Sequence, residues 1–374
     1  MTQRFLRPTW AEVDLDSFRA NLQTVASLIP PGTGIMAVVK ANGYGIGAIP
    51  AARTALTVPQ VAGLAVATAD EALELREDGI QGFMLILGPV TAEAAVVMVE
   101  RNVSVAVTSV DALRAAQSAG HSVRRKAKVH LKIETGMGRV GMAPGDELDA
   151  ALAALKEGPD AEVEGVFTHF AVADTDKTYT SMQMDAFQAA LERLSQMGVR
   201  PRFRHAANSA AILDFPRAHL DLVRPGIILY GSYPDETLSG KALIKPVLSL
   251  LSRVSHVKKV PAGYSVGYGR THVTTHATTI VTVPIGYADG YPRLLSGRGS
   301  VLLHDKRFPV AGRVCMDQIM VDVGSEEVQV GDLVTLIGTQ GGETITVDEV
   351  AAHSQTIAHE VLTGITARVP RVYS

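Results

Sequence analysis

Short apolar runs recur along the first 230 residues, and segments with apolar residues at every third or fourth position separate them. The runs are rich in β-branched residues and have the length of buried strands. They cover residues 35–39, 61–66, 83–87, 103–107, 127–133, 163–168, 202–205 and 227–230. The pattern predicts eight strands with helices between them.

The segments between the runs carry helix signals of their own. Residues 16–28 and 185–197 have the helical period of apolar positions. Thr68 and Glu71 form a capping box ahead of a further helix, which we expect to end at Gly79.

Eight strands alternating with helices over about 200 residues favour a (β/α)8 barrel. The alternative is a doubly wound open sheet, which would carry a glycine-rich turn after its first strand if it bound a dinucleotide. Glycines do follow the first strand, but residues 43–47 have the spacing G-x-G-x-G rather than G-x-G-x-x-G. The barrel is therefore the fold we expect.

The pattern changes after Gly231, where an irregular stretch leads into a segment dominated by β-branched runs and turns. These runs cover residues 247–257, 278–284, 300–303, 308–314, 318–323 and 332–337, and short helical patterns follow at 346–353 and 360–366. We therefore predict a barrel domain at 1–240 and a mostly β domain at 241–374. A short strand predicted at 9–14 precedes the barrel, and we expect it to pack on the second domain.

Composition narrows the class of protein. The chain has 374 residues, 47% of them hydrophobic and 20% charged, with a net charge of −3. These values are typical of an ordinary globular protein and argue against nucleic acid or a membrane surface as a partner. No signal peptide or membrane-spanning run is evident, so the expected location is the cytoplasm. Cys315 is the only cysteine, which excludes an intrachain disulfide and a cysteine-based zinc site, and we expect it in the core.

Residues able to do chemistry follow several of the predicted barrel strands. At the carboxyl ends of barrel strands such residues face the active-site mouth. They are Lys40 and Tyr44, then Lys132 with Glu134 and Arg139, then His169, then Asn208 and Ser209, and finally Arg224 with Gly226. We also expect the glycine-rich segment after Lys40 to be flexible enough for its backbone to approach a ligand closely. The combination predicts an active site at this end of the barrel.

Eight segments carry a resemblance that covers nearly the whole chain. They are AVVKANGYG at 37–45, LKIETGMGRVGM at 131–142, THFAVAD at 168–174, ANSAA at 207–211, VRPGIILYG at 223–231, VGYGR at 266–270, PIGYADGYPR at 284–293 and GRVCMDQIMVDV at 312–323. In this order they resemble the alanine racemases, a family of pyridoxal 5'-phosphate enzymes with a (β/α)8 barrel and a C-terminal β-domain. The resemblance implies interconversion of L- and D-alanine, with D-alanine supplied for peptidoglycan.

Racemisation removes the proton on Cα from one face and returns one to the other, so it needs two bases. The resemblance implies that Lys40 carries the cofactor and is the base for the D-enantiomer. Tyr268 is then the base for the L-enantiomer, and a relay through His169 and Arg224 activates it. Arg224 should face the pyridine nitrogen, where a permanently charged guanidinium donates a hydrogen bond without readily protonating the ring.

The resemblance assigns further contacts around the cofactor and the substrate. Tyr44, Ser209, Gly226 and Ile227 match the family's phosphate ligands, and Val38, Leu87 and Asn208 line the cofactor pocket. Arg139 and the backbone N–H of Met316 match contacts to the substrate carboxylate, and Asp317 flanks Met316. Lys132 matches a lysine that is often carbamylated in the family.

The family's sites are shared between the subunits of a homodimer, and Tyr268 and Met316 reach the barrel of the partner. Tyr287 and Arg293 are then expected at the substrate entrance across the same interface. No metal is implied. The chain departs from the family's usual motif at Gly43 and Ile46, and Ala367 stands where some members have a tyrosine that contacts the phosphate.

Other activities remain open on the sequence. A related racemase could accept serine as well as alanine. A decarboxylase of the same fold would carry an acidic group where Arg224 stands, which argues against that reading. A non-catalytic pyridoxal-phosphate homeostasis protein would lack the second domain.

Overall fold

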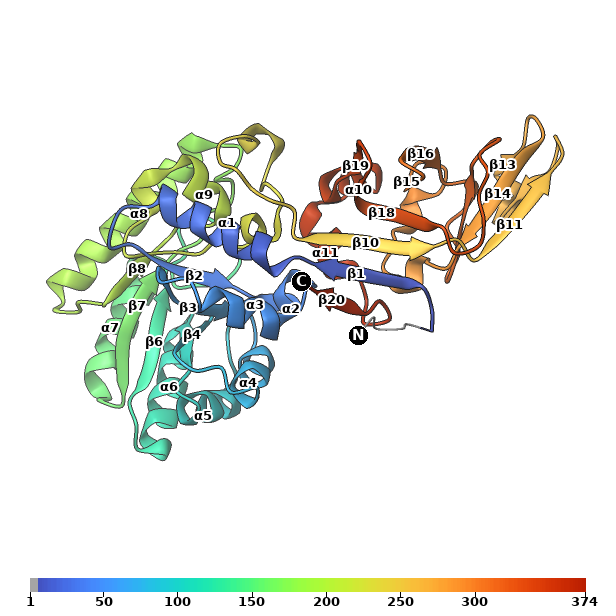
Figure 1. The fold of residues 1–374 in the computed structure, drawn as a ribbon. Helices are drawn as coiled ribbons and strands as arrows, with labels where there is room; N and C mark the ends of the chain where they lie inside the picture. The colour runs from blue at the N-terminus through green and yellow to red at the C-terminus, as the bar shows by residue number, and fades with distance from the viewer. Residues whose placement is uncertain (1–5) are drawn as a thin grey trace.

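The computed structural model describes residues 6–374, and eight of the strands close into a parallel barrel (Figure 1). Neighbouring strands follow chain order, and the eighth pairs with the first. They are β2 (Gly34–Val38), β3 (Val61–Val66), β4 (Phe83–Ile86), β5 (Ser104–Val107), β6 (Ala127–Lys132), β7 (Ala161–Phe167), β8 (Phe203–His205) and β9 (Leu222–Val223). The predicted (β/α)8 barrel is confirmed.

Helices surround the barrel and each turns an apolar face toward it. They are α1 (Leu15–Leu28), α3 (Ala48–Ala55), α4 (Ala69–Glu77), α5 (Ala92–Glu100), α6 (Val110–Val123), α7 (Asp146–Glu157), α8 (Lys177–Gln196) and α9 (Ser209–Asp214). The capping box predicted at Thr68 is present, since Glu71 N–H donates to the Thr68 hydroxyl and the Glu71 carboxylate accepts from Thr68 N–H. Helix α8 begins eight residues before the predicted start because its first turns are polar and show no apolar period.

The eighth strand was predicted at the wrong place. Residues 227–230 form a buried 3₁₀-helix, η2 (Ile227–Tyr230), and the strand is β9 instead. Pro225 has no N–H for a sheet ladder, and Gly226 N–H donates to the Ser209 hydroxyl, so the chain leaves the sheet before the apolar run begins. A run of four apolar residues fits a buried strand and a buried helical turn equally well.

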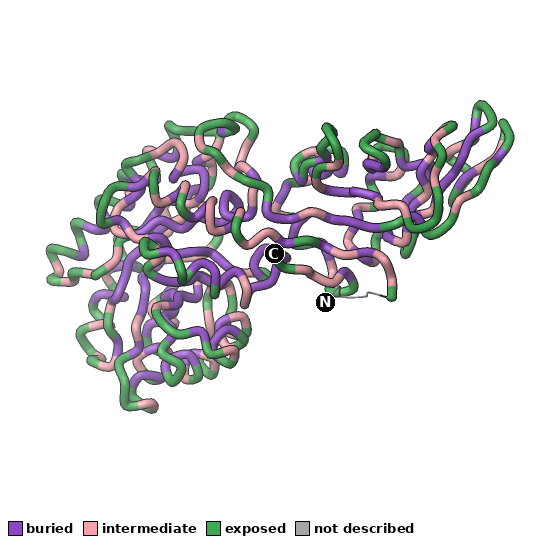
Figure 2. Tube along the Cα trace, viewed as in Figure 1, coloured by how far each residue is buried: buried purple, intermediate pink, exposed green. Residues whose placement is uncertain are grey.

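The second domain is mostly β, as predicted, and its strands pair mainly in antiparallel fashion. They are β10 (Leu248–Arg253), β11 (His256–Val260), β12 (Ser265–Val266), β13 (His272–Val273), β14 (Thr278–Val283), β15 (Ser300–Leu303), β16 (Lys306–Pro309), β17 (Ile319–Asp322), β18 (Leu333–Gln340) and β19 (Glu343–Ile345), followed by α10 (Val347–His353), α11 (Ala358–Gly364) and β20 (Arg371–Tyr373). The single run predicted at 247–257 divides into β10 and β11, which belong to different sheets. Figure 2 shows the barrel strands buried along most of their length, whereas β11 at the far end of this domain is mostly exposed.

The two ends of the chain meet between the domains. Strand β1 (Thr9–Val13) pairs antiparallel with β10 and parallel with β20, so it lies in the sheet of the second domain. Helix α1 then leads directly into the barrel, as Figure 1 shows. The second domain is therefore tied to the barrel at both ends of the chain.

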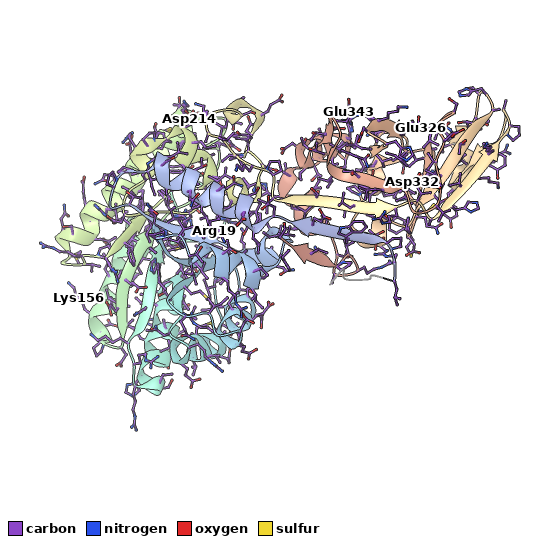
Figure 3. The ribbon with its side chains drawn as sticks, in the orientation of Figure 1. Arg19, Lys156, Asp214, Glu326, Asp332 and Glu343 are labelled. Atoms are coloured by element: carbon purple, nitrogen blue, oxygen red, sulfur yellow. The ribbon has the colours of Figure 1, made fainter. Side chains whose placement is uncertain are left out.

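Asp214, labelled in Figure 3, lies at the end of α9 and pairs with Lys177 and Lys241. Lys241 belongs to the irregular segment that joins the two domains, so this carboxylate fastens the segment to the barrel. Both lysines are exposed, and each pair therefore contributes no more than about 1 kcal/mol to stability.

No helix within residues 6–374 is long and apolar enough to cross a membrane.

Candidate active site

The residues expected to do chemistry in the barrel lie together at the carboxyl ends of its strands. Lys40 follows β2, Arg139 lies in the loop after β6, and His169 follows β7. Ser209 begins α9 directly after β8, and Arg224 follows β9. Because the strands are parallel, all five residues surround one mouth of the barrel.

Lys40 opens a turn that is held in an uncommon conformation rather than the flexible segment we expected. Ala41, Asn42 and Tyr44 have φ values of 52°, 52° and 49°, in the left-handed region. For residues with a side chain this conformation costs about 1–2 kcal/mol each, so contacts from outside must hold it. The Glu71 carboxylate accepts from Ala41 N–H at 2.7 Å.

The second domain also holds this turn. Arg371 Nε donates to Gly45 O at 3.0 Å, and the Tyr373 hydroxyl donates to Ile46 O at 2.9 Å. A side chain at Gly45 would overlap the backbone of Leu362 in α11. The position of Lys40 therefore depends on contacts made by residues more than 300 positions later in the chain.

The electrostatics of the mouth shift Lys40 toward its neutral amine form. Burial lowers the pKa of Lys40, the charge of Arg139 lowers it further, and Glu71 opposes the shift. A neutral amine is the form that can attack a carbonyl or accept a proton.

Tyr44 and Gly226 form a closely packed cradle at one side of the mouth. The Tyr44 ring stacks on Tyr230 with centroids 4.4 Å apart, and the Tyr230 hydroxyl donates to Val38 O at 2.7 Å. A Cβ at position 226 would overlap the Tyr44 hydroxyl. Burial raises the pKa of Tyr44, so its hydroxyl stays protonated and can donate to an anion.

The hydroxyl of Ser209 lies in the same cradle, where it accepts from Gly226 N–H at 2.9 Å. The Asn208 side chain caps α9 by accepting from Ala211 N–H at 3.0 Å. Ile227 begins η2, and the first amides of a helical turn have no partner within it. The hydroxyls of Tyr44 and Ser209 therefore lie beside Gly226 and the start of η2, and such groups suit a phosphate.

Arg224 is buried and fixed by its surroundings. It donates to His205 Nδ1 at 2.9 Å, to the carbonyls of Thr168 at 2.7 Å and Ala206 at 2.9 Å, and to His169 Nδ1 at 3.4 Å. Burial, and then the charge of Arg139, lower the pKa of Arg224 to about 9, which leaves it charged at neutral pH. Burial and the same cations keep the pKa of His169 well below its usual range, so His169 is a neutral acceptor.

Lys132, the last residue of β6, is buried, and its Nζ has no hydrogen-bond partner within residues 6–374. It lies over the Phe167 ring, 5.0 Å from the centroid. Burial and the charges of Arg224 and Arg139 lower the pKa of Lys132 to about 7, against the opposing effect of Glu134. An unpartnered buried amine is rare and points to a missing partner or a modification.

The residues expected from the second domain lie elsewhere. Tyr268 is 70% exposed and Met316 is 52% exposed, and Tyr287 and Arg293 are also exposed. Within one chain the segment that carries Tyr268 lies between β12 and β13, far from the barrel mouth (Figure 1). One chain therefore does not bring these residues to Lys40.

Two neighbours of Met316 are placed differently from one another. Asp317 pairs with Arg368 at 2.7 Å. Cys315 is only half-buried and lines a hollow together with Tyr268 and Met320, so the prediction that it lies in the core is wrong. Val314 before it is buried and Met316 after it is exposed, so Cys315 lies where this segment passes from the core to the surface.

Sequence reasoning missed three residues that contact the site. His205 accepts from Arg224, Tyr230 stacks on Tyr44, and the His359 ring lies 5.8 Å from the Tyr44 ring. His205 ends a barrel strand, the same signal that identified His169. Tyr230 ends the run predicted as the eighth strand, so the same signal could have found it. His359 lies in α11, a segment that carries no such signal.

Comparison with known proteins agrees with this geometry. Residues 13–234 match the family model "Alanine racemase, N-terminal domain", and residues 247–373 match "Alanine racemase, C-terminal domain". Alanine racemases of Desulforamulus reducens and Carboxydothermus hydrogenoformans are each 46% identical, over 98% of this chain and 99% and 100% of their own. The crystal structures of alanine racemase from Streptomyces lavendulae and Bacillus anthracis are 40% identical, cover 99% of this chain and 98% and 96% of their own, and both superpose with a TM-score of 0.94.

Proposed function

This chain belongs to the alanine racemase family, and on that basis we propose how its residues carry out the family's reaction, the interconversion of L-alanine and D-alanine. The observation that carries the proposal is the barrel mouth, where an amine with a lowered pKa, a fixed arginine and a cradle for a phosphate surround one space.

The mouth fits pyridoxal 5'-phosphate. Position 226 has no room for a side chain, and two hydroxyls point to the same place. The residues that would hold the cofactor are Lys40, Tyr44, Val38, Leu87, His169, Asn208, Ser209, Arg224, Gly226 and Ile227. When bound, pyridoxal 5'-phosphate supplies an acceptor for the electrons left when the bond between Cα and its hydrogen breaks.

Two bases work on opposite faces of the substrate. The Lys40 amine accepts the Cα proton of the D-enantiomer, and the Tyr268 hydroxyl serves the L-enantiomer. The lowered pKa of Lys40 suits this role, because it makes the neutral amine, the form that can accept a proton, easier to reach. Arg139 and the backbone N–H of Met316 hold the substrate carboxylate and so fix which face meets which base.

Arg224 disfavours side reactions. Its pKa of about 9 leaves it charged, and its terminal nitrogens are already bonded to His205, His169 and backbone carbonyls. It would donate to the pyridine nitrogen without giving up its proton. A weaker electron acceptor shortens the life of the carbanion, which disfavours side reactions. The same residue argues against a decarboxylase, which would need an acid there.

The site is shared between two copies of the chain in a head-to-tail homodimer. Exposure of Tyr268, Met316 and Tyr287 supports this arrangement, since large side chains so exposed are typical of an interface. Tyr287 and Arg293 line the substrate entrance across that interface. Each barrel thus receives its second base from its partner.

Lys132 carries a carbamate. Its neutral amine adds to the carbon of CO2 and releases a proton, which leaves an anion beside Arg139 that orients the guanidinium through charge-assisted hydrogen bonds. The unpartnered Nζ and its pKa of about 7 support this step.

The wider role follows from the product. D-alanine made in the cytoplasm of a bacterium supplies peptidoglycan synthesis. We place the boundary between the two domains near residue 240, and the gap between the two matched family models, which cover 13–234 and 247–373, supports this.

Chiral analysis of several L-amino acids incubated with the purified, cofactor-loaded protein tests the activity. We expect alanine to reach an equal mixture of enantiomers from either side. Equal rates on serine would indicate a racemase of broader specificity. Cofactor binding without inversion of any amino acid would indicate a non-catalytic homeostasis protein and overturn the proposal.

A further inference from the structure

A hydrogen-bonded chain of buried side chains runs through the inside of the barrel, from Arg224 at the mouth toward the opposite end. Arg224 donates to His205 Nδ1 at 2.9 Å. His205 Nε2 lies 2.8 Å from His130 Nδ1. His130 Nε2 lies 3.2 Å from Glu164 Oε2. All four residues are less than 9% exposed, and a barrel interior normally holds apolar side chains instead.

The direction of every hydrogen bond in this chain follows from its two ends. Arg224 can only donate, so His205 Nδ1 must accept, and a neutral His205 then carries its proton on Nε2. That proton goes to His130 Nδ1, which leaves the His130 proton on Nε2, facing Glu164. A carboxylate can only accept, so the other end requires the same direction. Burial lowers the pKa of both histidines, which agrees with two neutral rings.

The residues packed around this hydrogen-bonded chain leave space for the His130 ring and fix the His205 ring. A side chain on Gly165, the residue after Glu164, would overlap the His130 ring. The Phe167 ring stacks on His205 with centroids 4.9 Å apart and planes 3° apart. The glycine makes room for one imidazole and the phenylalanine holds the other in one plane.

Glu164 supplies the negative charge at the end of this hydrogen-bonded chain. Burial raises its pKa, but hydrogen bonds from His130 and from Ser104, at 2.5 Å, outweigh this and hold the pKa below its usual range. Among the described residues no carboxylate lies within 4 Å of Arg224. Besides burial, the charge of Arg139 lowers the pKa of Arg224, so the charge that acts on it is a cation. The carboxylate at the far end of the chain is therefore joined to a guanidinium that lacks a direct counter-charge.

We infer that Glu164 is a positioning residue for Arg224, whose guanidinium it holds in one orientation and one charge state through His130 and His205. The inference rests on the proposed function only for what Arg224 contacts, and the direction of the hydrogen bonds stands without it. The reaction has no direct use for Glu164, His130 or Gly165, so the chain would otherwise be an unexplained polar core.

The first test is nitrogen NMR of the full chain labelled with ¹⁵N-histidine and loaded with pyridoxal 5'-phosphate. We expect His130 and His205 each to be neutral with the proton on Nε2. A proton on Nδ1 of either ring, or a doubly protonated ring, would overturn the inference. The tautomers can be measured whatever reaction the protein catalyses, so this result is independent of the proposed function.

The second test compares three variants by kinetics and by the absorbance of the bound cofactor. Glu164→Gln keeps the shape but removes the charge, and Gly165→Ala displaces His130 while leaving Glu164 in place. Each should lower kcat about tenfold in both directions with KM nearly unchanged, and should shift the absorbance maximum of the cofactor. Ser104→Ala removes one of the hydrogen bonds that keep the same carboxylate ionised but leaves the hydrogen-bonded chain intact, so it should lower kcat much less than Glu164→Gln.

A purely structural role for Glu164 would produce a different result. Glu164→Gln would then lower the melting temperature but leave kcat per bound cofactor and the absorbance maximum as in the wild type, and the inference would fail. An equal loss of kcat in Ser104→Ala would also overturn it, since the polar surroundings rather than the chain would matter. If neither Glu164 nor Gly165 variants fold, the tautomers of the wild type decide alone.

Discussion

The two halves of the proposed site differ in how far one chain completes them. In the barrel half, Arg224 is 4% exposed and donates four hydrogen bonds, and the turn after Lys40 is held from both domains. In the second-domain half, Tyr268 is 70% exposed and Met316 is 52% exposed. Folding of one chain therefore finishes the half that would bind the cofactor and leaves the other half exposed, as the proposed dimer requires.

This difference matches two requirements of the proposed reaction, a rigid site for the cofactor and a second base on the opposite face of the substrate. The groups that would hold a cofactor must be fixed before it binds, and burial in a barrel provides that. A base on the opposite face of the substrate must reach it without filling the mouth through which the substrate enters. A second copy can deliver that base from outside, and the interface can then also limit which substrates enter.

The largest effect is expected from Lys40→Ala, which removes the base in the buried half. Turnover should fall by about 10⁴-fold or more, and the absorbance band of the bound cofactor should disappear, because no other described amine takes its place at the end of β2. Absorbance spectra and chiral chromatography measure both. Lys156→Ala on the outer face of α7, labelled in Figure 3, is the control. An unchanged band in Lys40→Ala would remove Lys40 from its assigned role.

Tyr268→Phe removes the base in the exposed half. We expect turnover from L-alanine to fall by about 10²–10³-fold while the cofactor band stays as in the wild type, since the tyrosine lies outside the barrel that holds the cofactor. Steady-state kinetics from each enantiomer measures the loss. Tyr264→Phe, in the same domain, is the matched control. If cofactor binding and turnover fell together, Tyr268 would be a structural residue instead.

Mixing the two inactive variants tests whether the halves come from different chains. In a dimer of one Lys40→Ala and one Tyr268→Phe subunit, one site regains both bases and the other loses both. Random exchange puts half the chains in such dimers, so activity should return to about a quarter of the wild-type value. The measurement is turnover after exchange, which subunits of different mass can verify. Exchange without recovery would contradict a shared site.

Much of the barrel half could be predicted from the sequence, because strands and the polar residues at their ends leave a local pattern. Lys40 and His169 directly follow predicted runs that form strands, and Ser209 comes shortly after another. Arg224 precedes the run predicted as the eighth strand and follows β9 instead. The left-handed turn at Ala41 and Asn42 could not be predicted, because its stability comes from Arg371 and other distant contacts rather than from local preference.

Other features of the barrel left no local signal at all. The chain of His205, His130 and Glu164 depends on which strands are neighbours inside a closed barrel, and that is known only once the barrel closes. The eighth strand was misplaced because Pro225 and Gly226 redirect the chain just before a run that looks equally apolar in either structure. The exposure of Tyr268 depends on the surface around it, which no short motif describes.

The smallest effect is expected at Lys132, where pH should control the modification. Its pKa of about 7 lies far below the usual value for lysine, so the amine is mostly charged below that pH and mostly neutral above it. Only the neutral amine adds to CO2, so the carbamate should increase as pH rises from about 6 to about 8. Carbon NMR of the enzyme supplied with ¹³C-bicarbonate measures the carbamate directly.

The variant Lys132→Met should lack the carbamate signal. It should also raise KM for alanine several-fold with a smaller change in kcat, because Arg139 loses the anion that orients it. A signal that persists in Lys132→Met, or that is absent from the wild type at the higher pH, would rule out a carbamate at this position.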